Sequence, residues 1–353
     1  MAITATLLGV GFVVGAERLG RVTGIVDFPR PGEVQERVLP RTGGYGVFLA
    51  FWAAIGLSFL VEPSNLERLA ADNWRLLGLF VGSLVMLPLA VADDLRRLGP
   101  WPQLLGHAVV AAIPVFFGLR IEEVATPFGI VKIPEELAGP LAALWIVGMI
   151  NAINFIDSMD GLAAGIVAIA AIVLFFRSAW FGQPSIAILP VALAGACLGF
   201  LTRNWHPSRV ILGSSGALFL GYVLGATTSI GGAKIGTAFL VLAVPILDVA
   251  WVVYRRLSQG RSPLHGGDSE HLAHRLKLLG LRDPAIVLSL YTVSAAASMA
   301  ILLTHSPLPT MGKLYLAAAV VGAVMVGLVI VTRLTTPRVR PLSLDSPEKP
   351  RIP

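Results

Sequence analysis

Charged residues are scarce in this chain. Asp, Glu, Lys and Arg make up only 14% of its 353 residues, whereas 55% of the residues are hydrophobic. A soluble globular domain carries charge on about a quarter of its residues. The composition therefore excludes an ordinary soluble domain, and it is typical of a protein that crosses a membrane several times.

A disulfide framework and a secretory leader are both missing from the sequence. Cys197 is the only cysteine, so no intramolecular disulfide can form, and its apolar surroundings are typical of a small core side chain. The apolar residues 2–16 follow Met1 without a basic segment. Because cleaved secretory leaders begin with such a segment, we expect residues 2–16 to be retained as a helix.

Apolar sequence is abundant and falls into eleven stretches. Most of them approach the ~20 residues that a helix needs to cross the hydrocarbon core of a bilayer. Lipid offers the backbone no hydrogen-bond partners, so stretches of this length are expected to be helical. The sequence therefore predicts an all-α polytopic membrane protein with about 11 transmembrane helices. The stretches are 2–16, 44–61, 75–92, 103–118, 139–156, 161–176, 184–201, 209–226, 235–253, 285–304 and 314–332.

Lys and Arg are shared unevenly between the loops on the two sides of this predicted domain. Alternate loops hold 20 and 7 of the 27 basic residues. Since basic loops stay in the cytoplasm, we expect a multi-pass protein of the plasma membrane with its N-terminus outside. The same rule accounts for the net charge of +6, so the charge does not indicate nucleic-acid binding.

Two segments outside the apolar stretches have patterns of their own. Residues 120–136 fall on the external side and carry two short β-prone runs around Pro127-Phe128-Gly129, which predicts a small external β-hairpin. Residues 334–353 include five prolines, which predicts a disordered cytoplasmic tail. Residues 1–333 are then expected to form a single transmembrane domain.

Polar residues suited to chemistry gather in the loops of the predicted cytoplasmic side. The block 151–165 reads Asn-Ala-Ile-Asn-Phe-Ile-Asp-Ser-Met-Asp-Gly-Leu-Ala-Ala-Gly and lies between two apolar stretches. Ionisable groups in such a place are costly unless they face water, a cation or a polar ligand, so they mark a functional site. Asn154, Asp157 and Asp160 are spaced three residues apart, which on one helix would align them in a polar stripe.

A second acidic group, Asp93 and Asp94, ends the third apolar stretch and is followed by Arg96 and Arg97. Two interpretations stay open. The four residues form an interfacial charge cluster, or the acids bind a metal or deprotonate an acidic substrate. Mg²⁺ would suit the second interpretation, because proteins hold this ion with one or two carboxylates together with substrate phosphate oxygens.

The loop 254–283 combines His, Asp and Arg, which suits a diphosphate. Arg makes bidentate contacts with phosphate oxygens, and His can donate a hydrogen bond near neutral pH. Zinc is a weaker interpretation because the loop has no cysteine, and a basic loop with incidental histidines is the plain alternative. The candidate ligands in the loop are Arg261, His271, His274 and Arg275.

Glycine occurs in two informative patterns. Gly43 and Gly44 begin the second apolar stretch directly after a cytoplasmic loop, which indicates close backbone approach to a ligand or to a helix. Gly-x-x-x-Gly pairs begin at Gly11 and at Gly221. That spacing is typical of helix packing in membranes, and an exposed pair would favour a homodimer.

These motifs, in this order, resemble those of the polyprenyl-phosphate N-acetylhexosamine-1-phosphate transferases, within glycosyltransferase family 4. The resemblance runs from about Gly24 to Arg275, and the block Asn151–Gly165 is its most specific part. Eleven spans with an external N-terminus look like the subgroup that uses UDP-N-acetylhexosamines, rather than the ten-span peptidoglycan enzyme. The other matching segments are Asp27–Pro29, Pro40–Gly44, Ala92–Asp94, Asp248–Arg256, Gly260–Pro263 and Asp268–Leu276.

The resemblance implies an enzyme that transfers N-acetylhexosamine 1-phosphate from a UDP-sugar to undecaprenyl or another polyprenyl phosphate in the bilayer. UMP would leave, as the first membrane step of cell-envelope glycan synthesis, and Mg²⁺ or Mn²⁺ would neutralise the diphosphate. The implied catalytic residues are Asp93, Asp94, Asp157 and His271. The implied substrate-binding residues are Asn154, Asp160, Gly43, Gly44, Arg261, His274 and Arg275. The implied metal ligands are Asp157, Asn154 and Ser214.

Four positions depart from the family pattern. Ser214 stands where an aspartate that binds Mg²⁺ is expected, and its hydroxyl is a neutral and weaker ligand. Ala273 replaces one His of a His-x-His-His motif, and Gln103 stands where a lysine is expected after the acidic pair. The first cytoplasmic loop carries Glu33-Val-Gln35-Glu36 in place of a basic cluster with histidine.

The departures leave a second function open. All four lie in motifs and none in the apolar scaffold, as expected for a catalytically silent paralogue that binds UDP-sugar or polyprenyl phosphate as a regulator or partner subunit. An unrelated ion-coupled transporter is a third hypothesis. It is disfavoured because no inverted repeat is visible and the acids cluster at one face rather than at the midplane.

Overall fold

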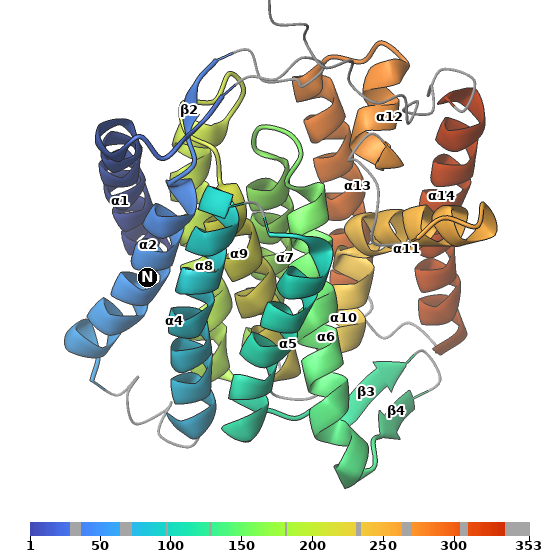
Figure 1. The fold of residues 1–353 in the computed structure, drawn as a ribbon. Coiled ribbons are helices and arrows are strands. Elements are labelled where there is room, and N and C mark those ends of the chain that lie inside the picture. The colour runs from blue at the N-terminus through green and yellow to red at the C-terminus, as the bar shows by residue number, and fades with distance from the viewer. Residues whose placement is uncertain are drawn as a thin grey trace, which may run out of the picture.

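The computed structural model describes residues 1–28, 37–63, 73–96, 98–126, 129–180, 182–230, 234–262, 270–303 and 310–335. Within these ranges the chain is a bundle of helices with two small two-stranded sheets (Figure 1). The helices are α1 (Ala2–Thr23), α2 (Gly43–Val61), α4 (Asn73–Arg96), α5 (Pro100–Phe116), α6 (Glu135–Ile156), α7 (Leu162–Trp180), α8 (Pro184–Asn204), α9 (Gly213–Ser229), α10 (Lys234–Val241), α11 (Ala243–Ser258), α12 (Leu272–Leu278), α13 (Asp283–Leu303) and α14 (Thr310–Thr335). The strands are β1 (Val26–Asp27), β2 (Leu39–Pro40), β3 (Glu123–Thr126) and β4 (Gly129–Lys132).

Each of the eleven apolar stretches falls on helix, with one difference. Residues 235–253 form two helices, α10 and α11, that meet at an angle of 76°. Pro245 lies in the first turn of α11, where its missing N–H is tolerated, whereas inside one continuous helix it would remove a hydrogen bond. In the described ranges, seven helices are long and apolar enough to cross a membrane, or eight with the bent pair as one span. The all-α polytopic class is confirmed, and the count of eleven stays a prediction.

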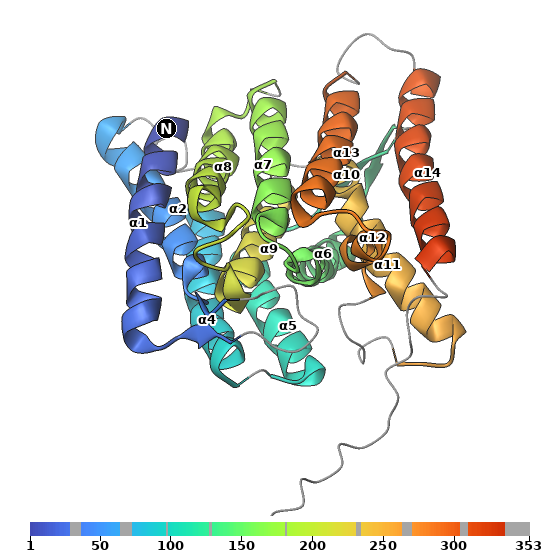
Figure 2. The same ribbon diagram turned by 90° about the horizontal axis from the view of Figure 1, so that it is seen from above.

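Helix α9 occupies the centre of the bundle (Figure 2). All of its residues are buried, and it packs against α2, α4, α6, α7, α8 and α10. Glycine allows this close packing, because a Cβ at Gly221 would lie 2.6 Å from the Cα of Ile150 in α6. The Gly-x-x-x-Gly pair that begins at Gly221 is therefore used inside the bundle. Gly11 has open space beside it, so its pair is the one that leaves a face open for the predicted homodimer.

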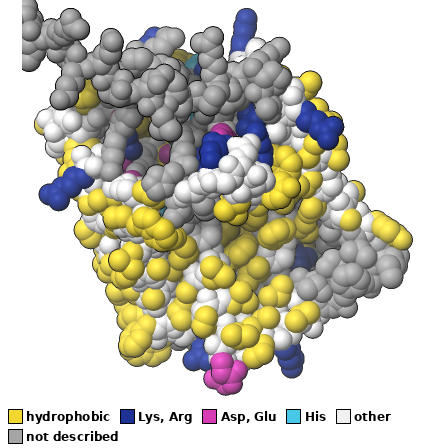
Figure 3. Space-filling model, turned by 45° about the vertical axis from the view of Figure 1, so that its right-hand side comes forward, with side chains coloured by type: hydrophobic (Ala, Val, Ile, Leu, Met, Phe, Trp, Pro, Cys, Tyr) yellow, Lys and Arg dark blue, Asp and Glu magenta, His cyan; other side chains and the backbone are white. Residues whose placement is uncertain are grey.

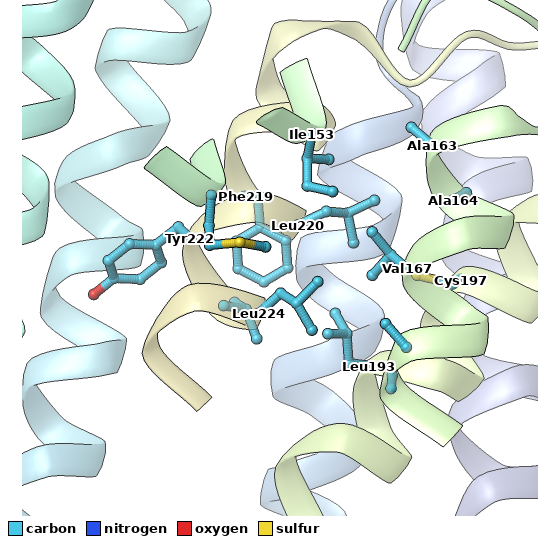
Figure 4. Packing of buried hydrophobic residues seen from close by; sticks show 14 of the residues in the cluster. Ile153, Ala163, Ala164, Val167, Leu193, Cys197, Phe219, Leu220, Tyr222 and Leu224 are labelled. Atoms are coloured by element: carbon cyan, nitrogen blue, oxygen red, sulfur yellow. The ribbon is translucent and has the colours of Figure 1, made fainter. Parts of the chain in front are cut away.

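The core around α9 joins aromatic and aliphatic side chains from α6, α7 and α8 (Figure 4). Cys197 is buried in it, as the sequence predicts. The ring of Tyr222 points out of this cluster toward α4, where its hydroxyl donates to the carbonyls of Gly78 and Leu79, both at 3.2 Å. This hydrogen bonding satisfies a polar group that would otherwise be costly to bury.

The two ends of the bundle differ. Strands β3 and β4 form an antiparallel hairpin with Glu123 opposite Lys132 and Thr126 opposite Gly129, within the predicted range 120–136. Figure 1 shows this hairpin at one end, and β2 and α12 at the other. The hairpin is therefore confirmed, while its external location stays a prediction. The wall between the ends is covered by hydrophobic side chains (Figure 3), as a lipid-facing surface requires.

The predicted tail begins slightly too early. Helix α14 continues to Thr335, so residues 334 and 335 are helical. Thr335 is buried, and its hydroxyl accepts a hydrogen bond from Nη1 of Arg275 at 3.0 Å, which accounts for the additional helical residues. The rest of the predicted tail lies outside the described residues.

Candidate functional site

The acidic pair lies in the last turn of α4, facing the N-terminus of α9. The side chain of Asp94 is fully buried. It accepts hydrogen bonds from the backbone N–H groups of Ser214 and Ser215, at 2.8 and 3.2 Å. A helix N-terminus presents unpaired N–H groups and a partial positive charge, so it stabilises a carboxylate in this position. Asp94 therefore joins the end of α4 to the start of α9.

Asp93 is held by donors from three other places. It accepts hydrogen bonds from Oγ of Ser214 at 2.5 Å, from Nε2 of Gln103 in α5 at 2.6 Å, and from the backbone N–H of Leu98 at 3.0 Å. Ser214 therefore contacts both acids, through its hydroxyl at Asp93 and its backbone N–H at Asp94. Gln103, noted in the sequence only as a departure from the family pattern, belongs to the same cluster.

Arg41 supplies the cation of this cluster. Its Nη2 lies 3.2 Å from Oδ1 of Asp94, and its Nη1 lies 3.3 Å from Oδ1 of Asp27 in β1. Burial alone would lower the pKa of Arg41, but the carboxylates of Asp94 and Asp27 outweigh burial and raise it. One of the two sequence interpretations placed Arg96 and Arg97 in a charge cluster with the acids. It gave Arg41 no role, because nothing in a linear motif indicates that Asp94 lies beside it.

The sequence predicts close backbone approach of Gly43 and Gly44 to a ligand or to a helix, and in the structure they lie against the start of helix α9. Their N–H groups donate to the carbonyls of Ile211 and Leu212, at 3.2 and 2.9 Å, and a Cβ at Gly44 would overlap the backbone of Gly216. The start of α2 therefore packs directly on the start of α9. The predicted role of these glycines in substrate binding stays a prediction.

The predicted polar stripe of Asn154, Asp157 and Asp160 is not formed. Helix α6 ends at Ile156 with Asp157 as its C-cap, and a turn leads to α7. Gly161 has a φ of +77°, a backbone conformation that glycine adopts without steric cost and that a helix cannot contain. The stripe prediction was wrong because α6 ends at Ile156, so Asp157 and Asp160 lie in the turn and not on the helix that carries Asn154.

The turn of residues 157–161 is tied to the loop between α8 and α9. Oδ2 of Asp160 lies 3.0 Å from Nδ1 of His206 and accepts the N–H of Ser208 at 3.1 Å. Oδ1 of Asn204 accepts the N–H of Gly161 at 2.8 Å. The α8–α9 loop leads directly into the N-terminus of α9, so the turn and the acidic pair lie at the same end of the bundle.

His271 is positioned by a buried carboxylate. It caps the N-terminus of α12, and its Nδ1 lies 2.9 Å from Oδ2 of Asp248 in α11. The imidazole ring stacks on Phe155 of α6, with 5.5 Å between ring centroids. His271 and Asp248 line a small, mostly apolar pocket together with Leu162 and Leu290. Asp248 was part of a matching segment but was not predicted as a site residue.

Arg261 shares Glu270 with a second arginine. Nη2 of Arg261 and Nε of Arg256 lie 2.8 and 3.4 Å from the two carboxylate oxygens. Burial would raise the pKa of Glu270, but the two guanidinium groups outweigh burial and lower it. The side chain of Arg261 is 46% exposed, so its guanidinium can also contact an anion from solvent. The neighbouring residues 263–269, which include Asp268, lie outside the described residues.

Arg275 and His274 lie on α12. Arg275 is almost fully buried, and its Nε donates to the carbonyl of Glu270 at 2.6 Å while its Nη1 reaches Thr335. It therefore holds α12 to the end of α14. Its predicted role in substrate binding stays a prediction, as does that of His274, which follows His271 by about one helical turn.

His107 is a polar residue that sequence reasoning missed. It is fully buried on α5, one turn after Gln103, and neither ring nitrogen has a hydrogen-bond partner in the described part of the chain. Asp93 and Asn151 are the polar groups near it, although neither completes a hydrogen bond. A lone histidine in an apolar helix gives no signal in a single sequence.

Mg²⁺ is the cofactor that the family pattern implies, and the acidic pair does not fit it. The carboxylate oxygens of Asp93 and Asp94 already accept hydrogen bonds from a hydroxyl, an amide, backbone N–H groups and a guanidinium. No group of three His, Cys, Asp or Glu side chains among the described residues is arranged to hold a metal ion. Ser214, one of the predicted metal ligands, uses its hydroxyl as a donor to Asp93.

Comparison with known proteins gives matches over much of the chain. The family model described as glycosyl transferase family 4 matches residues 76–232. That range contains the acidic pair, the block 151–165 and the whole of α9.

Relatives of known name align over most of their length. A probable undecaprenyl-phosphate N-acetylglucosaminyl 1-phosphate transferase of Bacillus subtilis is 30% identical, over 82% of this chain and 80% of the relative. A decaprenyl-phosphate N-acetylglucosaminephosphotransferase of Mycolicibacterium smegmatis is 32% identical, over 76% and 72%. An undecaprenyl-phosphate alpha-N-acetylglucosaminyl 1-phosphate transferase of Escherichia coli O157:H7 is 26% identical, over 84% and 81%. With such identity over such a share of the chain, this protein belongs to glycosyl transferase family 4, among the polyprenyl-phosphate N-acetylhexosamine-1-phosphate transferases.

Proposed function

We propose that this protein transfers N-acetylhexosamine 1-phosphate from a UDP-N-acetylhexosamine to a polyprenyl phosphate and releases UMP. The observation that carries the proposal is the gathering of charged and polar side chains at one end of a membrane bundle. The acidic pair, the turn 157–161 and the pair of His271 and Asp248 all lie at that end, opposite the β3–β4 hairpin. The names of the aligned relatives describe the same class of transfer for those proteins.

The proposed reaction exchanges one phosphoanhydride for another. An oxygen of the polyprenyl phosphate attacks the sugar-bearing phosphorus of the UDP-sugar and forms a new P–O bond. The bond between that phosphorus and the bridging oxygen breaks, and the electron pair leaves with UMP. Such a transfer needs positioning and compensation of negative charge more than covalent participation by the protein.

The described residues suit these two tasks. The partly exposed guanidinium of Arg261 can make bidentate contacts with phosphate oxygens, which favours binding of a diphosphate. Asp248 fixes the orientation of the His271 ring, so that the imidazole can donate a proton or a hydrogen bond at a defined position. Asp157 ends α6 beside these groups and is our proposed acidic contact to the substrate. Binding of Mg²⁺ or Mn²⁺ at Asn154 and Asp157 stays a prediction, and no step above uses it.

Further proposals concern the setting of the enzyme. We propose that the end of the bundle that carries the candidate site faces the cytoplasm. The excess of Lys and Arg in the loops on that side supports this orientation. This orientation would give the site access to a soluble UDP-sugar on one side and to a lipid phosphate at the bilayer boundary on the other. A homodimer through the open face of α1 at Gly11 also stays a prediction.

The test is release of UMP by the purified protein in detergent, with undecaprenyl phosphate and a panel of UDP-N-acetylhexosamines. Reactions would be run with Mg²⁺, with Mn²⁺ and with chelator. We expect release that depends on both substrates, and its loss in Asp157→Asn. Binding of UDP-sugar without UMP release under every condition would contradict the proposal.

A further inference from the structure

Two adjacent buried carboxylates normally require a compensating cation. Asp93 and Asp94 retain only 7% and 9% of their exposure, and like charges this close repel strongly where water is excluded. Such a pair usually binds a divalent ion or keeps a proton. The donors around this pair offer a third solution, because they come from the protein itself and reach both carboxylates.

Positive charge is supplied by two fixed groups. The guanidinium of Arg41 contacts Asp94 through Nε and Nη2, at 3.3 and 3.2 Å, and the N-terminus of α9 directs the N–H groups of Ser214 and Ser215 at the same carboxylate. Arg41 is itself held by Asp27, while α9 is fixed by burial on all sides. Neither group can move away without disturbing the fold.

Neutral donors supply the hydrogen bonds to the second carboxylate, that of Asp93. Ser214 donates to one oxygen of Asp93, and Gln103 donates to the other. These are two of the four positions that depart from the family pattern, which has an acid at the first and a base at the second. The two changes remove one negative and one positive charge and converge on one carboxylate. Together they keep the charge balance of the site while filling the lone pairs that a metal ion would use.

We propose that the acidic pair of this chain is stabilised without a divalent cation. Arg41 and the N-terminus of α9 carry the compensating charge, and Gln103 and Ser214 saturate Asp93. The pair then acts as a clamp between α4, α5 and α9, and as a positioning element for the substrate site. The proposal does not depend on transferase activity, so it stands or falls separately from the proposed function.

The test measures thermal unfolding in detergent with Mg²⁺ and with chelator. A ligand that binds only the folded state raises the melting temperature, so we expect the wild type to shift by less than about 1 °C. Ser214→Asp places a third carboxylate beside Asp93. We expect it to melt lower in chelator and to recover by at least about 2 °C in Mg²⁺. Ser214→Ala, the matched control, should melt lower with no response to Mg²⁺.

Arg41 provides a second variant should Ser214→Asp fail to fold. Arg41→Gln removes the fixed cation, so its melting temperature should come to depend on Mg²⁺, whereas Arg41→Lys keeps the charge and should not respond. A wild type stabilised by Mg²⁺ would overturn the proposal if Asp93→Asn abolishes that stabilisation. If Asp93→Asn retains it, the ion binds elsewhere, and the proposal holds.

Discussion

The two acidic segments of the candidate site differ in how completely the protein satisfies them. Asp94 is fully buried and receives donors from Arg41 and from the N-terminus of α9, whereas Asp160 keeps 25% of its side chain exposed and contacts a loop histidine. The first lies at the ends of long helices and the second in a five-residue turn. Asp94 and Asp160 both belong to motifs of the family pattern, but one is fully buried and the other is partly exposed to solvent.

This difference predicts that the buried acidic pair contributes mainly to the stability of the fold and that the turn 157–161 contributes mainly to the chemistry. A carboxylate whose lone pairs are all used by protein donors stabilises the fold, and its loss leaves those donors unpaired. A carboxylate in a partly exposed turn contributes less to stability and can exchange its partners for a substrate. Variants in the two segments should therefore affect different measurements.

The largest effect is expected in the turn and on turnover. Asp157→Asn keeps the shape of the C-cap but removes its charge, so UMP release should fall by a factor of about 10² to 10⁴. Its free energy of unfolding should change by no more than about 0.5 kcal/mol. The two values come from a turnover assay and denaturation of the same preparation. Loss of folding together with activity would remove the distinction between the segments.

The next largest effect is expected at the pair and on stability. Asp94→Ala leaves two N–H groups of α9 without their acceptor and removes one of the two carboxylates beside Arg41, so the free energy of unfolding should fall by about 3 kcal/mol. Asp160→Ala is the matched control and should cost less than about 1 kcal/mol. Denaturation of both variants in detergent gives the comparison. Equal losses would mean that burial does not distinguish these carboxylates.

Glu270 lies between the two extremes and allows a pH test. Its pKa is lowered below the ordinary 4.5 because Arg261 and Arg256 outweigh the effect of burial. Its stabilising contribution is therefore present above pH 4.5 and is lost as the pH falls through the lower pKa of the folded state. Glu270→Gln should melt below the wild type at neutral pH, and the difference should shrink as the pH falls below 4.5. A difference that persists in acid would assign the effect to packing instead of charge.

The smallest effect is expected at His107. Its ring nitrogens have no partners in the described part of the chain, so His107→Leu removes an unsatisfied polar group and should leave stability unchanged or raise it by up to about 1 kcal/mol. Thermal melting measures this change. A clear loss of stability would show that the imidazole belongs to the polar network of Asp93, together with Gln103 of the same helix.

Sequence alone predicted the helices well, because membrane spans are long and apolar and each expected stretch falls on helix. It also selected Asp93, Asp94, Ser214 and His271 through their motifs. The partners Arg41 and Asp248 were missed, since each is distant in sequence from the group it contacts and such contacts depend on tertiary packing. His107 was missed because a single histidine in an apolar helix gives no sequence signal. The polar stripe is absent for a local reason, because α6 ends at Ile156 inside the motif and Asp157 and Asp160 follow in a turn.

The burial of α9 has a consequence for biogenesis. All residues of α9 are buried, so the helix has no side that faces lipid. Its stability in the membrane therefore depends on packing against neighbouring helices. All of those neighbours except α10 precede it in the chain, so they are synthesised before α9 emerges. The acidic pair at the end of α4 is then already in place when Ser214 arrives. The hydrogen bonds between Ser214 and the acidic pair would then form when α9 packs against the helices that precede it in the chain.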